Sequence, residues 1–179
     1  ITHGNGPQVG LLALESSADP ALAVAYPLDA LGAETQGLIG YWLAQALTNA
    51  VPDRTAVAIV TRTIVAADDP AFARPTKFIG PMYDAARATA IAAKQGWTVE
   101  PDGSGWRRVV PSPAPIAVVE IDTIEHLFRN GTLVVCGGGG GVPVMRTADG
   151  ALVGVEAVID KDLTAALIAE AIGADALLL

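Results

Sequence analysis

Five consecutive glycines, Gly137–Gly141, are the feature that most limits what this chain can form. Ordering five glycines costs more backbone entropy than ordering any other five residues, so a folded protein keeps them where side chains would obstruct something. The run follows the apolar residues Leu133–Cys136 and precedes Val142-Pro143-Val144. A buried strand that leads into a glycine loop favours close approach of a phosphate group, and a flexible linker is the alternative. Neither GxxxxGK[ST] nor GxGxxG can be drawn through the run, which excludes a Walker loop or a simple dinucleotide loop.

The rest of the chain alternates apolar helical patterns with β-branched runs. We expect helices from Pro7 onward and over Leu28–Ala50, Tyr83–Gln95, Ile121–Arg129 and Asp160–Ile172, and strands over Thr55–Ala66, Thr132–Cys136 and Asp175–Leu179. This order predicts an α/β fold with a mostly parallel sheet. Prolines interrupt residues 68–115 repeatedly, so we expect this segment to be a protruding insertion.

Composition excludes several classes of function. Of the 179 residues 51% are hydrophobic and 17% charged, which is incompatible with a disordered chain. A net charge of −8 argues against nucleic acid and anionic membrane surfaces as partners, and no run is apolar enough for a membrane span. The single cysteine, Cys136, excludes a disulfide framework and is compatible with a reducing cytoplasm. With only His3 and His126 beside it, we expect no metal site built from side chains alone.

A second glycine-bearing loop opens the chain. His3-Gly4-Asn5-Gly6 stands directly before Pro7, which is suited to the first turn of a helix. Unpaired N–H groups and the positive end of the helix dipole attract an anion at such a place. An ordinary tight turn before a helix is the alternative.

Two lysines stand in restrained surroundings. Lys77 lies in PTKFIGP, where prolines stiffen the loop, and Lys161 lies between two aspartates at the start of a predicted helix. Asp160 suits the helix cap, and either lysine could simply be solvated. Together with the two glycine loops, these lysines favour phosphoryl or anion binding by positioning and electrostatics.

Six motifs, taken in order, resemble the carbamate kinase branch of the amino acid kinases. They are THGNGPQVG (2–10), TQGLIGYWL (35–43), DPAF with PTKFIGP (69–81), GWRRVVPSPAP (105–115), GGGGVPV (138–144) and VEAVIDKD (155–162). The resemblance implies a three-layer α/β/α sandwich with a protruding subdomain. Residues 1–67 would be an incomplete substrate lobe, 68–115 the subdomain, and 116–179 the end of the substrate lobe with the start of the nucleotide lobe.

The implied activity is reversible phosphoryl transfer between carbamoyl phosphate and ADP, giving carbamate and ATP with Mg²⁺, in a cytoplasmic homodimer of arginine catabolism. Carried over residue by residue, the resemblance assigns substrate binding to Gly4, Asn5, Gly6, Gly138, Gly139 and Gly140, and catalysis to Lys77, Lys161 and Asp162. Lys77 would reach in from the subdomain, Lys161 would stabilise charge on the transferring group, and Asp162 would orient the lysines. Another acyl-phosphate kinase of this fold and a non-catalytic anion-binding domain stay open as alternatives.

The resemblance also predicts that both ends are truncated. The family's first strand with a Gly-Gly-Asn loop would precede Ile1, and a further catalytic lysine in a Pro-Lys motif would follow Leu179. We therefore expect the 179-residue chain alone to form no ATP from carbamoyl phosphate and ADP. Phe78 departs from the family pattern, in which proline is usual at this position.

Overall fold

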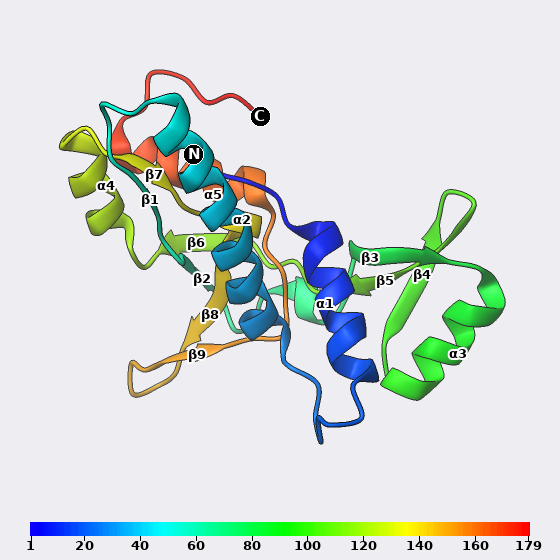
Figure 1. The fold of residues 1–179 in the computed structure, drawn as a ribbon. Coiled ribbons are helices and arrows are strands. Elements are labelled where there is room, and N and C mark those ends of the chain that lie inside the picture. The colour runs from blue at the N-terminus through cyan, green and yellow to red at the C-terminus, as the bar shows by residue number, and fades with distance from the viewer.

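A computed structural model describes residues 1–179 (Figure 1). Its helices are α1 (Gly6–Ala18), α2 (Leu28–Ala50), α3 (Ala85–Gln95), α4 (Ile121–Arg129) and α5 (Lys161–Ile172), with short 3-10 turns η1 (Pro70–Phe72) and η2 (Gly138–Gly140). Its strands are β1 (Ala56–Ala58), β2 (Arg62–Val65), β3 (Lys77–Tyr83), β4 (Thr98–Asp102), β5 (Gly105–Val110), β6 (Pro115–Val118), β7 (Leu133–Val135), β8 (Val142–Arg146) and β9 (Leu152–Gly154). The predicted α/β class is confirmed.

The strands form three sheets, with orders β1-β7, β6-β2-β8-β9 and β3-β5-β4. Only the pairs β1-β7 and β2-β8 are parallel, so the sheets are more mixed than the mostly parallel sheet expected from the sequence. Short connections account for two of the four antiparallel pairs: residues 103–104 join β4 to β5, and the turn Thr147–Gly150 lies between β8 and β9.

Helices cover both faces of the β1-β7 pair. Val57 and Ile59 pack with the residues of α4 and α5, whereas Ala58 between them meets Gly40 of α2. Because successive side chains of a strand point to opposite faces, α2 lies on one side and α4 with α5 on the other (Figure 1). The core on the α4 side contains Val118, Ile124, Val134, Cys136 and Ile168. This arrangement is the predicted three-layer α/β/α sandwich.

The antiparallel sheet β3-β5-β4 carries α3 and projects away from these layers (Figure 1). It falls within residues 68–115, the range expected for the subdomain, although the exact division of the chain stays a prediction. Helix α3 begins at Ala85, two residues later than expected, because the Asp84 side chain caps it by accepting a hydrogen bond from Arg87 N at 2.8 Å. Helix α1 packs on β3, and a second core joins Val9, Ala13, Leu28, Leu31, Ile79 and Val110.

Helix α1 meets β3 backbone to backbone at one point. A Cβ on Gly10 would lie 2.0 Å from both Cα and N of Gly80, and Gly80 itself has φ +73°. We expect Gly10→Ala to lower the free energy of unfolding by about 1–3 kcal/mol, the usual cost of overpacking, because no side chain can move aside. Gly37→Ala is the matched control: Gly37 is exposed in α2 with nothing within 4 Å, so this change raises stability by about 0.5–1 kcal/mol. Urea unfolding of the full-length protein measures both, and equal effects would contradict the backbone contact.

Two predicted strands were wrong. Residues 55–66 form two strands in different sheets, because Gln36 of α2 binds the backbone of Thr61 between them. Its Oε1 accepts from Thr61 N at 2.8 Å, and its Nε2 donates to Thr61 O at 3.0 Å. The Thr61 N–H is then unavailable for strand pairing, whereas Thr61 O also accepts from Val142 N of β8 at 2.7 Å. Residues 175–179 form no strand, since no neighbouring strand pairs with them.

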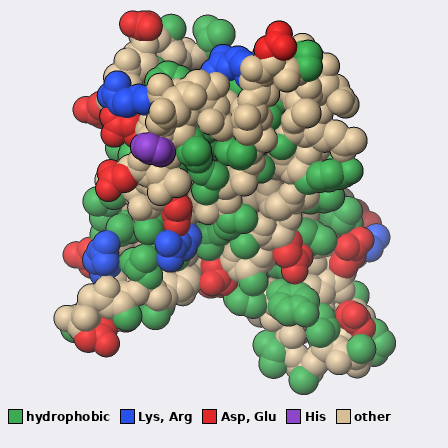
Figure 2. Space-filling model, turned by 60° about the vertical axis from the view of Figure 1, so that its left-hand side comes forward, with side chains coloured by type: hydrophobic (Ala, Val, Ile, Leu, Met, Phe, Trp, Pro, Cys, Tyr) green, Lys and Arg blue, Asp and Glu red, His purple; other side chains and the backbone are tan.

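The surface carries mixed charge. On the face that Figure 2 shows, Lys and Arg side chains are scattered among Asp and Glu side chains instead of forming one basic patch. None of the five helices combines the length and hydropathy needed to cross a bilayer.

Candidate functional site

A cavity of about 470 Å³ lies where the start of α1, the start of β3, the segment before α5 and the glycine loop meet. It is lined by Gly4, Asn5, Gly6, Pro7, Gln8, Val9, Lys77, Phe78, Ile79, Gly139, Val158, Ile159 and Lys161. Six of the nine residues expected to bind or act on substrate therefore share one cavity. Gly138, Gly140 and Asp162 lie beside it without lining it.

The start of α1 presents unused hydrogen-bond donors to this cavity. The first backbone N–H of the helix with a partner in the chain is that of Val9, which donates to Asn5 O at 2.9 Å. The N–H groups of Gly4, Gly6 and Gln8 have none, and the Asn5 side chain does not cap the helix. A helix start of this kind binds an anion through its N–H groups and its dipole.

The side chain of Asn5 is instead held toward α2. Its Nδ2 donates to Thr35 Oγ1 at 2.8 Å, and Thr35 Oγ1 donates to Gly32 O at 2.7 Å. Thr35 is fully buried, so this chain of hydrogen bonds fixes the amide at the cavity wall.

The glycine loop has no room for side chains. A Cβ on Gly139 would lie 2.2 Å from Asn5 Cγ, and one on Gly138 would lie 2.2 Å from His3 Nε2. Gly139 has φ +62°, a conformation that glycine adopts without the strain other residues incur. The two glycine-bearing loops are thus pressed against each other, and Gly139 N donates to His3 O at 2.8 Å.

Buried threonines anchor this loop from behind. Gly137 N donates to Thr61 Oγ1 at 2.9 Å, and Gly140 O accepts from Thr63 Oγ1 at 2.8 Å and Thr164 Oγ1 at 2.9 Å. All three threonines are fully buried. Because buried hydrogen bonds are costly to break, the loop is held in one conformation instead of acting as a linker.

Each cavity lysine is paired with an aspartate. Lys77 Nζ lies 2.7 Å from Asp160 Oδ2, and Lys161 Nζ contacts Asp162 Oδ1. The hydrogen bond from Lys77 holds the pKa of the Asp160 carboxyl below its ordinary value, so this carboxylate stays ionised at neutral pH. The stem of Lys161 lies over Gly4, where a Cβ would meet its Cδ at 3.5 Å. Two cations and a row of N–H donors therefore surround the same space.

Comparison with known proteins places this arrangement in a family. The Amino acid kinase family matches residues 1–179. The chain belongs to the amino acid kinase family. Over its whole length it is 52% identical to a carbamate kinase of Rhizobium meliloti (strain 1021) and covers 56% of that protein.

Solved structures of carbamate kinases are similar to the structure of this chain. A carbamate kinase from Giardia lamblia bound to citric acid has a TM-score of 0.89 and 42% identity over 97% of this chain and 58% of that one. The same enzyme bound to AMP-PNP has a TM-score of 0.82 and 42% sequence identity, over 97% of this chain and 57% of that one. The chain thus spans somewhat more than half the length of the relatives it matches.

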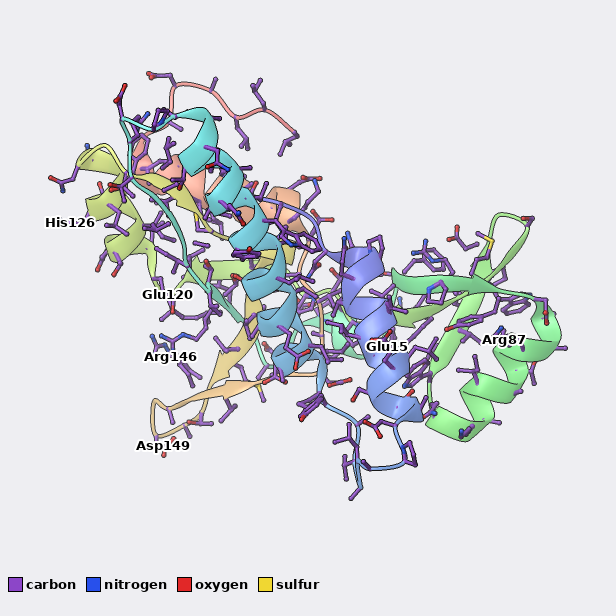
Figure 3. All side chains as sticks on the ribbon, viewed as in Figure 1. Glu15, Arg87, Glu120, His126, Arg146 and Asp149 are labelled. Carbon is purple, nitrogen blue, oxygen red and sulfur yellow. The ribbon has the colours of Figure 1, made fainter.

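Parts of the site in this amino acid kinase chain were not predicted from the sequence. Asp160 was expected to cap α5, which it does, but its contact with Lys77 across 83 positions had no local signal. The apolar wall of Phe78, Ile79 and Val158 was also missed. Figure 3 places His126 on α4, away from α1, so the only histidine near the cavity loops is His3.

The carboxylates of this site do not fit a resident Mg²⁺. Both oxygens of Asp160 already accept hydrogen bonds, from Lys77 and from Asp162 N, and Asp162 contacts Lys161. No three His, Cys, Asp or Glu side chains gather as metal ligands elsewhere in the chain.

Proposed function

We propose that this chain is the substrate-binding part of a carbamate kinase, which transfers a phosphoryl group between carbamoyl phosphate and ADP to give carbamate and ATP. One observation carries the proposal: Lys77, Lys161 and the free N–H groups at the start of α1 converge on one cavity. They do so in a chain half identical to a carbamate kinase along its whole length.

Phosphoryl transfer requires cations and hydrogen-bond donors arranged around the transferred group. Phosphoryl transfer spreads negative charge over the three equatorial oxygens, so catalysis rests on positioned donors and cations more than on a general base. The N–H groups of Gly4, Gly6 and Gln8 would hold the oxygens of the acyl phosphate. Lys161 would neutralise the charge that develops in transfer, and Lys77 would close over the same group from β3. Gly139 would let the transferred group approach the backbone.

The nucleotide is the second substrate in this proposal. It is supported by the Giardia lamblia enzyme, a carbamate kinase similar to this chain that has been solved with AMP-PNP. Mg²⁺ belongs to that substrate, because the aspartates at the cavity are already paired. The homodimer, the cytoplasmic location and the role in arginine catabolism stay predictions of the resemblance.

The direct test is ATP formation from carbamoyl phosphate and ADP by the full-length protein, followed by coupled luminescence. In the reverse direction, carbamate should consume ATP, whereas acetylglutamate and aspartate should not. Turnover with an amino-acid carboxylate but not with carbamate would favour another acyl-phosphate kinase. Saturable binding of carbamoyl phosphate without turnover would favour an anion-binding domain.

A further inference from the structure

We propose that Asp160 is a positioning residue for phosphoryl transfer: its carboxylate holds the Lys77 ammonium at the cavity and thereby fixes the sheet β3-β5-β4 over the substrate site. The inference rests on the proposed function for its kinetic consequences. It assigns a role to a residue that the motifs mark only as a helix cap.

The two oxygens of Asp160 have separate tasks. Oδ1 accepts from Asp162 N at 2.9 Å and so caps α5, while Oδ2 accepts from Lys77 Nζ at 2.7 Å. Asn and Ser cap helices about as well as Asp, so the cap alone does not require a charged side chain. The second oxygen and its negative charge are needed only by Lys77.

The contact joins two parts of the fold. Lys77 is the first residue of β3, and Asp160 directly precedes α5 in the layered sandwich. A lysine is a point charge on a flexible four-carbon stem, and its position must be set by a partner. Asp160 supplies that partner at the place where the outer sheet meets the cavity. The partly exposed pair contributes little to stability, so its value lies in geometry.

A second ion pair crosses the same junction and provides a matched control. Arg108 of β5, stacked 4.0 Å from the centre of the Trp97 ring, has Nη2 3.4 Å from Glu156 Oε1. Glu156 Oε2 accepts from Leu28 N at 2.8 Å, and Glu156 does not line the cavity. Glu156→Gln therefore weakens a charge contact between the same parts without touching Lys77.

The experiment uses the full-length protein with Asp160→Asn, Asp160→Ser, Glu156→Gln, Lys77→Ala and the double variant Lys77→Ala with Asp160→Asn. We expect Asp160→Asn and Asp160→Ser to lower kcat by roughly 10- to 100-fold, by analogy with the loss of groups that orient the ligands of a metal ion. KM for ADP and the melting temperature should hardly change, because the cap is retained. Glu156→Gln should keep the wild-type kcat.

The double variant shows whether Asp160 acts through Lys77. Once Lys77 is absent, Asp160→Asn should lower kcat no further, since the effects of two residues acting as a unit do not add. An unchanged kcat in Asp160→Asn would overturn the proposal. So would equal losses in Asp160→Asn and Glu156→Gln, or a further full loss in the double variant.

A labelling measurement separates this inference from the proposed function. Brief acylation with sulfo-NHS-acetate, read by mass spectrometry, should modify Lys77 several-fold faster in Asp160→Asn than in the wild type, with exposed Lys94 as internal reference. The rate in Glu156→Gln should not change. If the wild type makes no ATP, the proposed function fails while faster labelling still supports the Lys77–Asp160 unit. Equal labelling of Lys77 in the wild type, Asp160→Asn and Glu156→Gln would overturn that unit.

Discussion

Replacing Lys161 by alanine is expected to lower kcat/KM for ATP formation by about 100- to 1,000-fold, the usual effect of removing one donor that stabilises transition-state charge. Lys161 lines the cavity from the first residue of α5, and its stem lies over Gly4. The loss should appear mainly in kcat, because Lys161 is expected to stabilise the charge on the equatorial oxygens most strongly in the transition state. Steady-state kinetics of the full-length variant measure it.

Lys94→Ala is the control for loss of a positive charge. Lys94 lies in the last turn of α3, is exposed and does not line the cavity. Its replacement should leave kcat/KM unchanged. If Lys161→Ala also retains more than about a fifth of the wild-type kcat/KM, a loss of ~1 kcal/mol or less, Lys161 is a surface charge and has no role in transfer.

Gly139→Ala is expected to abolish most of the activity. The added Cβ would lie 2.2 Å from Asn5 Cγ and Nδ2, and φ at this position is +62°. Asn5 must then move, which breaks its hydrogen bond to Thr35 and shifts the start of α1. A displacement of about 1 Å at a reacting centre can cost about 100-fold in rate. Activity and thermal unfolding of the full-length variant would be measured together.

Gly150→Ala separates backbone strain from the steric conflict. Gly150 also has positive φ, +88°, but nothing lies within 4 Å of its would-be Cβ in the turn between β8 and β9. This variant should lose about 1–2 kcal/mol of stability from the strained conformation and none of its activity. If Gly139→Ala kept wild-type turnover, the close packing of the two loops would be irrelevant to function.

Local signals were enough to predict several elements. Helix α2 spans 28–50 as expected, since Pro27 ends the preceding segment and apolar residues recur at helical spacing. Helix α5 follows its cap at Asp160 and ends before Gly173, which has φ +64°. The loop before α1 and the glycine loop were also predicted from their glycines. Ordering glycines costs backbone entropy, so a folded chain keeps them where a side chain would not fit.

Long-range contacts account for what could not be predicted. The break in residues 55–66 depends on Gln36, which lies 25 positions before Thr61. Residues distant in the sequence determine which loop glycine lines the cavity. His3 lies against Gly138, and Ile159 lies against Gly140. Sequence spacing carries no information on such contacts, so all three glycines received one role although only Gly139 lines the cavity.

The most direct test of the central claim is a crystal structure of the full-length protein with a phosphonate analogue of carbamoyl phosphate. We predict that the phosphonate oxygens lie within hydrogen-bond distance of backbone N–H groups at the start of α1 and of Lys161 Nζ, with Lys77 on the opposite side. An analogue bound elsewhere, with this cavity empty, would contradict the assignment of the cavity as the phosphoryl-transfer site.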